Sequence, residues 1–146
     1  MADSVPPLEE VVAAFEIIDD WEERYRYVIE LGRDLPDFPE EQRTDANKVR
    51  GCVSQVWLDT TVENGSGQPP VLRFQGDSDA LIVKGLIAIL LSMFDGRTPG
   101  EIRDTDPEAI FAQLQLREHL TPQRSNGLTA MIRRIHGDAA AVAAAA

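Results

Sequence analysis

The feature that most constrains the fold is a nearly continuous apolar segment, residues 80–94, interrupted only by Lys84, Gly85 and Ser92. A helix that spans a membrane needs about 20 consecutive apolar residues, so these fifteen are too few. We therefore predict a helix buried at the centre of a globular domain. The polar residues 77–79, just before it, are candidates for its N-cap, and an acid there suits the positive end of the helix dipole.

Apolar spacing and capping residues predict further helices around this central one. An apolar stripe at i, i+3, i+4 and i+7 begins after the Pro6-Pro7 pair, and another recurs near the C-terminus. Asp20 and Thr98 are each followed three residues later by Glu, the pattern of a capping box, and Gly32 is predicted to end the second helix. The predicted helices span residues 8–18, 20–32, 80–94 and 106–116, and two more begin at residues 98 and 121.

A β-hairpin is predicted between the second helix and the central one. Residues 53–63 are rich in branched and aromatic side chains, residues 64–68 form a turn, and residues 71–75 form the returning strand. Lys48 and Val49 are a candidate third strand, and residues 35–47 are predicted to be a loop. The sequence therefore predicts an α+β domain in which five or six helices pack on a small antiparallel sheet of about three strands.

The domain is expected to cover residues 1–138. The alanine-rich segment 139–146 has high helix propensity, but no predicted element is available to pack against it, so we expect a flexible tail. The length of 146 residues is that of one ordinary domain.

Negative charge is concentrated at the N-terminal end. Residues 1–45 hold 14 acidic and 4 basic side chains, a net −10 out of −11 for the whole chain. This balance argues against binding to nucleic acid or membrane surfaces, and it indicates either a solvated face or a docking surface. A single cysteine and an N-terminus without a charged leader and apolar run predict a cytoplasmic location.

Few residues can carry chemistry. The Cys and His side chains are Cys52, His119 and His136, which are far apart and lack metal-ligand spacing, so we expect no metal and no bound cluster. Phosphate-binding loops and the GxSxG elbow are also absent from the sequence, and no cofactor is expected. His119 would be a general base in a self-contained thiol enzyme, but the sequence does not place it near Cys52.

Cys52 lies between a polar loop and the first predicted strand, directly after Gly51, which permits a tight turn. Lys48 and Arg50 place positive charge nearby, and cations favour the thiolate, the form that attacks sulfur. The alternative is a small, buried and inert cysteine, because free cysteine is among the most buried residue types.

Three long motifs resemble the signatures of the SufE family of sulfur acceptors, in the same order and spacing, over residues 8–137. They are Val49-x-Gly51-Cys52-x-Ser54-x-Val56-Trp57, Gly76-Asp77-Ser78-Asp79-Ala80-x-Ile82-Val83-Lys84-Gly85-Leu86 and Leu120-Thr121-Pro122-x-Arg124-Ser125-x-Gly127-Leu128-x-x-Met131.

The resemblance implies an α+β fold shared with cluster scaffolds of the IscU type. It also implies an accessory protein, not an enzyme, that takes persulfide sulfur from a pyridoxal-phosphate cysteine desulfurase of the SufS type, stimulates that desulfurase, and passes sulfur to a downstream iron–sulfur scaffold. With one thiol, the chain can carry sulfur but has too few ligands to hold a cluster. We expect the free chain to be a monomer or a weak homodimer.

The resemblance makes Cys52 the catalytic residue, and Arg50, Gly51, Asp79 and Arg124 candidates for partner binding or for orienting the cysteine loop. Asp79 can instead cap the central helix, and Arg124 can instead fix the start of its own helix. The loop is expected to swing out on docking and to shield the sulfur in an apolar pocket formed by the sheet and the helix over residues 80–94.

Two other functions remain open from the sequence. One is a single-cysteine thiol oxidoreductase or peroxidase, and the other is an interaction module whose cysteine is packed and inert.

Overall fold

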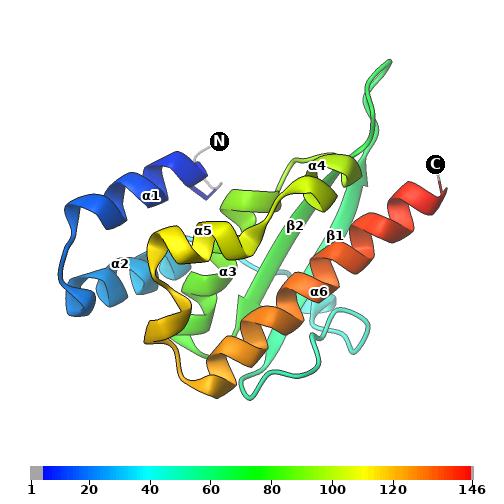
Figure 1. Cartoon of the computed structure of the whole chain (residues 1–146). Coiled ribbons are helices and arrows are strands. Elements are labelled where there is room, and N and C mark those ends of the chain that lie inside the picture. The colour runs from blue at the N-terminus through cyan, green and yellow to red at the C-terminus, as the bar shows by residue number, and fades with distance from the viewer. Residues whose placement is uncertain (1–4, 146) are drawn as a thin grey trace.

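A computed structural model describes residues 5–145 and shows a mixed α+β fold with a small antiparallel sheet, as predicted (Figure 1). Its elements are α1 (Leu8–Ile17), α2 (Trp21–Arg33), β1 (Val56–Glu63), β2 (Val71–Ser78), α3 (Leu81–Phe94), α4 (Pro99–Asp104), α5 (Pro107–Leu114) and α6 (Pro122–Ala145), with short 3-10 turns at Glu40–Gln42 and Arg117–His119. Within residues 5–145, no helix has both the length and the apolarity needed to cross a membrane.

Helix α3 forms the centre of the hydrophobic core, which confirms the prediction made from its apolar sequence. Eleven of its fourteen residues are buried, and it packs against α2 on one side and β2 on another. A Cβ added at Gly85 would collide with the carbonyl oxygen of Val28 on α2, so this crossing requires a glycine.

Gly32 was predicted to end α2, and this prediction is wrong. The helix continues to Arg33, and Gly32 is buried where α2 crosses α3. A Cβ at Gly32 would lie 2.5 Å from the backbone nitrogen of Gly85. The two glycines therefore serve the close approach of two helices, and Gly32 is not used for a left-handed turn.

The sheet consists of β1 and β2, paired from Val56 opposite Ser78 to Glu63 opposite Val71. The predicted first strand starts three residues too early, and the second continues to Ser78 rather than ending at residue 75. The predicted third strand is reduced to a single bridge between Lys48 and Trp57. It cannot extend because the chain turns at Gly51, where φ is +93°.

Helix α6 crosses the sheet and lies against α4 (Figure 1). Thr60 on β1 donates a hydrogen bond to the Asp138 carboxylate of α6 at 2.6 Å. The expectation that nothing packs against the alanine-rich end is wrong for Ala139, which is 3% exposed in the core, and Val142 also contacts that core. The domain boundary at residue 138 and the flexibility of residues 139–146 stay predictions, and Ala146 lies outside the described residues.

The caps predicted at Asp20 and Thr98 are found, and the cap predicted for the central helix is not. Asp20 accepts the Glu23 N–H, Thr98 and Glu101 form a full capping box, and Asp106 caps α5. Helix α3, by contrast, has Ala80 at its N-cap and no side-chain cap bond, so the interpretation of Asp79 as its cap is wrong.

Candidate functional site

The cysteine lies on a short loop that is fixed at both of its ends. The Val49 N–H donates to the Val56 carbonyl at 2.9 Å, and the Leu58 N–H donates to the Asn47 carbonyl at 2.8 Å. Residues 50–55 therefore form a closed loop that leads directly into β1. Gly51 is exposed and has φ +93°, a backbone conformation that L residues with a side chain rarely adopt.

Asp79 clamps the far end of this loop. Its Oδ1 accepts the Gln55 backbone N–H at 3.1 Å, and its own backbone N–H donates to the Gln55 carbonyl at 3.3 Å. These bonds explain why Asp79 does not cap α3, because its carboxylate already has a partner in the loop. They support the role of Asp79 in orienting the loop, which stays a prediction.

Cys52 is half-buried and lies against the first turns of α6. Its thiol donates a weak, long hydrogen bond to the Gly127 carbonyl, with a Sγ–O distance of 3.7 Å. A Cβ added at Gly127 would lie 3.4 Å from the Cys52 Sγ, so the missing side chain leaves room for the sulfur.

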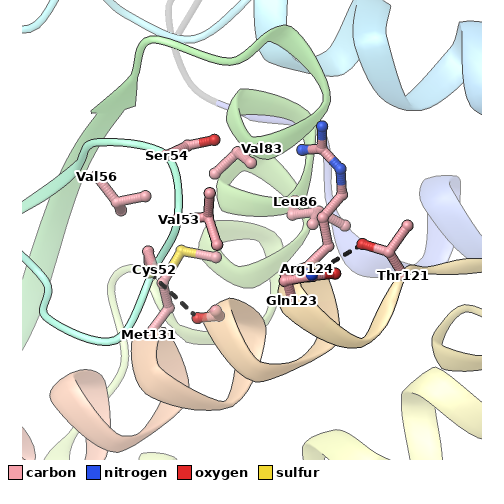
Figure 2. A pocket seen from close by; sticks show the side chains of 11 residues that line it. Cys52, Val53, Ser54, Val56, Val83, Leu86, Thr121, Gln123, Arg124 and Met131 are labelled. Atoms are coloured by element: carbon pink, nitrogen blue, oxygen red, sulfur yellow. Dashed lines mark hydrogen bonds between the residues drawn. The ribbon is translucent and has the colours of Figure 1, made fainter.

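A cavity of about 290 Å³ opens beside the Cys52 sulfur (Figure 2). Its wall is mainly apolar and comes from the loop, β1, α3 and the start of α6: Cys52, Val53, Ser54, Val56, Val83, Leu86, Thr121, Gln123, Arg124, Gly127 and Met131. The walls from the sheet and α3 agree with the expected pocket. Sequence reasoning missed the wall from α6, although the glycine in the third motif was a signal for it.

Burial raises the pKa of the Cys52 thiol above its ordinary value. The expectation that Lys48 and Arg50 favour the thiolate is therefore wrong for the free protein. Arg50 is exposed and, with Gly51 and Arg133, lines a different hollow, separate from the cavity that Cys52 lines. Burial therefore favours the protonated form of the Cys52 thiol.

Arg124 contributes its side chain to the cavity wall, and Figure 2 shows it extending from α6 toward α3. Its Nη1 is buried without a hydrogen-bond partner, and within residues 5–145 no ion pair to this guanidinium is found. The start of α6 is instead fixed by Thr121, whose Oγ1 accepts the Arg124 backbone N–H at 3.3 Å. The side chain of Arg124 therefore does not hold its own helix start.

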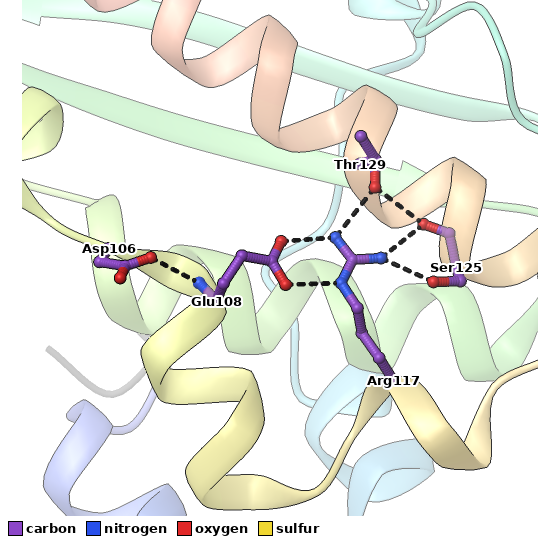
Figure 3. A network of polar contacts seen from close by, with 5 residues as sticks. All are labelled: Asp106, Glu108, Arg117, Ser125 and Thr129. Carbon is purple, nitrogen blue, oxygen red and sulfur yellow. Dashed lines mark hydrogen bonds and ion pairs between the residues drawn. The ribbon is translucent and has the colours of Figure 1, made fainter.

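A polar network around Arg117 holds the start of α6 in place (Figure 3). The Arg117 guanidinium donates to both carboxylate oxygens of Glu108 at 2.8 Å, to Ser125 Oγ at 2.6 Å and to Thr129 Oγ1 at 2.9 Å. The hydrogen bond from Arg117 lowers the pKa of Glu108. Sequence reasoning missed this network, because its members belong to three separate segments and form no motif.

The two histidines do not line the cavity of Cys52. His119 stacks on Trp21 with ring centroids 3.7 Å apart, and His136 packs edge-on against Phe94. Among the residues that the structure describes, no group of three or more His, Cys, Asp or Glu side chains is arranged to hold a metal.

These features define a class of protein: a small α+β domain that presents one thiol on a short loop, over an apolar cavity. A family model described as "SufE: Fe-S metabolism associated domain" matches residues 9–139, and the chain belongs to this family. Membership gives the chain a role in iron–sulfur metabolism.

Curated relatives agree with this assignment. An uncharacterized SufE-like protein of Rhizobium meliloti (strain 1021) is 52% identical over 132 residues, which cover 90% of this chain and 94% of the relative. A second, from Rhizobium etli, is 50% identical over 138 residues, covering 94% and 93%. The solution structure of a hypothetical protein from Thermus thermophilus has a TM-score of 0.74 at 21% identity and covers 97% of this chain and 98% of that one, so it supports the fold alone.

Proposed function

We propose that this protein accepts sulfur onto Cys52 from a pyridoxal-phosphate cysteine desulfurase of the SufS type, and delivers it for iron–sulfur cluster assembly. The observation that carries the proposal is the position of Cys52, the single cysteine of the chain, on a short loop beside an apolar cavity. Membership of the SufE family supports it, because the family implies interaction with a cysteine desulfurase.

The proposed transfer is an exchange between two sulfur centres. The Cys52 thiolate attacks the outer sulfur of a persulfide on the desulfurase, so that an S–S bond forms on Cys52 and the donor's S–S bond breaks. The donor cysteine leaves as a thiolate and takes up the proton that Cys52 loses. Rates of such exchange depend on the thiolate fraction, on the leaving group and on access to the sulfur.

The environment of Cys52 suits a carrier that is inactive until it docks. Burial raises the pKa of the thiol, so the free protein presents little of the attacking thiolate. We propose that residues 50–54 swing outward about Gly51 when the desulfurase binds, because the bonds of Val49 and Gln55 fix the two ends of the loop. The exposed side chains of Arg50 and Val53 then contact the partner.

The cavity also gives a place for the loaded sulfur. A persulfide is sensitive to reductants and oxidants, and an apolar wall that excludes water protects it. On this proposal the protein is an accessory factor rather than an enzyme, works in the cytoplasm, hands its sulfur to a downstream scaffold, and is a monomer or a weak homodimer when free.

The raised pKa of Cys52 weighs against a self-contained thiol oxidoreductase or peroxidase. Such enzymes depend on a thiolate, usually stabilised by a nearby cation or a helix N-terminus. The position of Cys52 beside an open cavity weighs against the third interpretation, an inert packed cysteine.

Intact-mass measurement tests the proposal. The protein is incubated with a SufS-type desulfurase and cysteine, and we expect a gain of about 32 Da, the mass of one sulfur, that reductant removes. Cys52→Ser is the matched control and should show no gain. An unchanged mass for the wild-type protein, under conditions in which the desulfurase turns over, would overturn the proposal.

A further inference from the structure

The guanidinium of Arg124 is a charge without a counter-charge. It lines a mostly apolar cavity, its Nη1 has no hydrogen-bond partner, and within residues 5–145 no carboxylate pairs with it. The Arg124 side chain as a whole is only partly buried, but a buried guanidinium nitrogen without a hydrogen-bond partner is unusual and calls for an explanation.

A lack of acidic side chains does not explain it. The chain holds 25 acidic residues against 14 basic ones, and seven other arginines of the described chain form ion pairs. Arg117 binds Glu108, and Arg73 binds Asp95 with two parallel hydrogen bonds of 3.1 Å. In the part of the chain that the structure describes, none of the residues that line the Cys52 cavity is acidic. The cavity therefore offers this guanidinium no counter-charge of its own.

We propose that the Cys52 cavity is a carboxylate-binding site, and that Arg124 binds the carboxylate of a small thiol acid. A guanidinium matches a carboxylate with two parallel N–H···O bonds, and the apolar wall from Val83 and Leu86 fits a short carbon chain. The cavity of about 290 Å³ has room for a molecule of this size, with its sulfur toward Cys52. Free cysteine and mercaptopropionate belong to this class.

The site gives such a thiol acid a role in sulfur release, and this part rests on the proposed function. The thiol of the bound molecule attacks the outer sulfur of the Cys52 persulfide. The Cys52 S–S bond breaks, a new S–S bond forms on the small molecule, and the proton of the attacking thiol passes to Cys52. The products are a small-molecule persulfide and the free thiol of Cys52, with no external oxidant or reductant.

The carboxylate site is tested without a desulfurase, so its failure is distinct from a failure of sulfur acceptance. Iodoacetate and iodoacetamide both alkylate thiols, but iodoacetate carries a carboxylate where iodoacetamide carries an uncharged amide. For the folded chain, the rate at which iodoacetate alkylates Cys52 is divided by the rate with iodoacetamide. This ratio is then divided by the same ratio for the chain unfolded in urea, which gives the quotient that is compared. A charge-assisted hydrogen bond to Arg124 should raise this quotient roughly tenfold.

Arg124→Gln should return the quotient to about one, and Arg124→Lys should keep part of the preference because it keeps the charge. Arg133→Gln is the matched control: it removes an exposed arginine from the same helix that does not line the cavity, and should leave the quotient unchanged. If Arg124→Gln fails to fold, a competition experiment with the wild-type protein still tests the carboxylate site. Propionate should then slow iodoacetamide in a saturable manner, and propionamide should not.

Equal quotients for the folded wild-type protein and Arg124→Gln would overturn the proposal. If the mass gain with the desulfurase were lost in Arg124→Gln while the quotient stayed the same, Arg124 would be assigned to the contact with the partner protein. That outcome would also overturn the small-molecule site.

Discussion

Asp79→Ala should release the cysteine loop without unfolding the domain. The substitution removes the carboxylate that accepts the Gln55 N–H at 3.1 Å. It keeps the backbone bond from residue 79 to the Gln55 carbonyl, because that bond needs no side chain. The loop would then be held at this end by one hydrogen bond instead of two.

The size of the effect follows from the exposure of this bond. A hydrogen bond to a charged group contributes about 1.5–3 kcal/mol when shielded from water, and both Asp79 and Gln55 are exposed, so we take about 1 kcal/mol. A change of about 1 kcal/mol in the opening equilibrium corresponds to about fivefold at 25 °C. The part of the alkylation rate that goes through loop opening should rise by the same factor.

The assay is alkylation of Cys52 by iodoacetamide in the free protein, with excess reagent and a fixed pH. Asp106→Ala is the matched control, since it also removes a carboxylate that accepts one backbone N–H, at 3.0 Å from Glu108 and away from the loop. Asp79→Asn keeps an acceptor oxygen and should be intermediate. Equal rates for Asp79→Ala and Asp106→Ala would refute the clamp, provided that urea unfolding shows both variants folded.

Two further predictions concern the core and the thiol. Gly85→Ala should lower the free energy of unfolding by about 3 kcal/mol, because its Cβ would displace the α2 backbone at Val28. Gly137→Ala, whose Cβ meets nothing within 4 Å, should raise that free energy by about 0.5–1 kcal/mol. Both changes are measured by urea titration. The alkylation rate of Cys52 should have its midpoint at higher pH in the folded chain than in the unfolded one. Because the folded pKa is raised, Cys52 favours folding below the unfolded pKa, and this advantage over Cys52→Ser should disappear as the pH rises through the folded pKa.

Local signals predicted the helices and the hairpin because each depends on neighbours in sequence. The capping box of Thr98 and Glu101 closes within one turn, and the apolar run of α3 has no other stable location than the core. The prediction for Gly32 was wrong because this residue contacts a second helix that is distant in sequence. A glycine near a helix end has the same local pattern whether it supplies a left-handed turn or a close contact.

The site was predictable in its centre and not in its surroundings. The context of Cys52 indicated a loop, and the motifs indicated Asp79 and Arg124. An acid ahead of a helix is a good cap by local rules, and only the tertiary structure shows that Gln55 already uses that carboxylate. The upward shift in the Cys52 pKa is equally non-local, because it comes from burial. The sequence shows which charged residues are near Cys52 along the chain, but it does not show how deeply the thiol is buried.

The loop that we propose to move is separate from the elements that form the core. Outside the loop, the cavity walls belong to β1, α3 and α6, and α3 is the most buried helix, so moving the α3 wall would disturb the core. The bond from Val49 to Val56 holds the loop to the sheet at one end, and the Asp79 clamp holds it at the other. On the proposed function, docking would need to shift only residues 50–54. Changes at the clamp should alter the reactivity of Cys52 with little effect on stability, whereas changes in α3 should do the opposite.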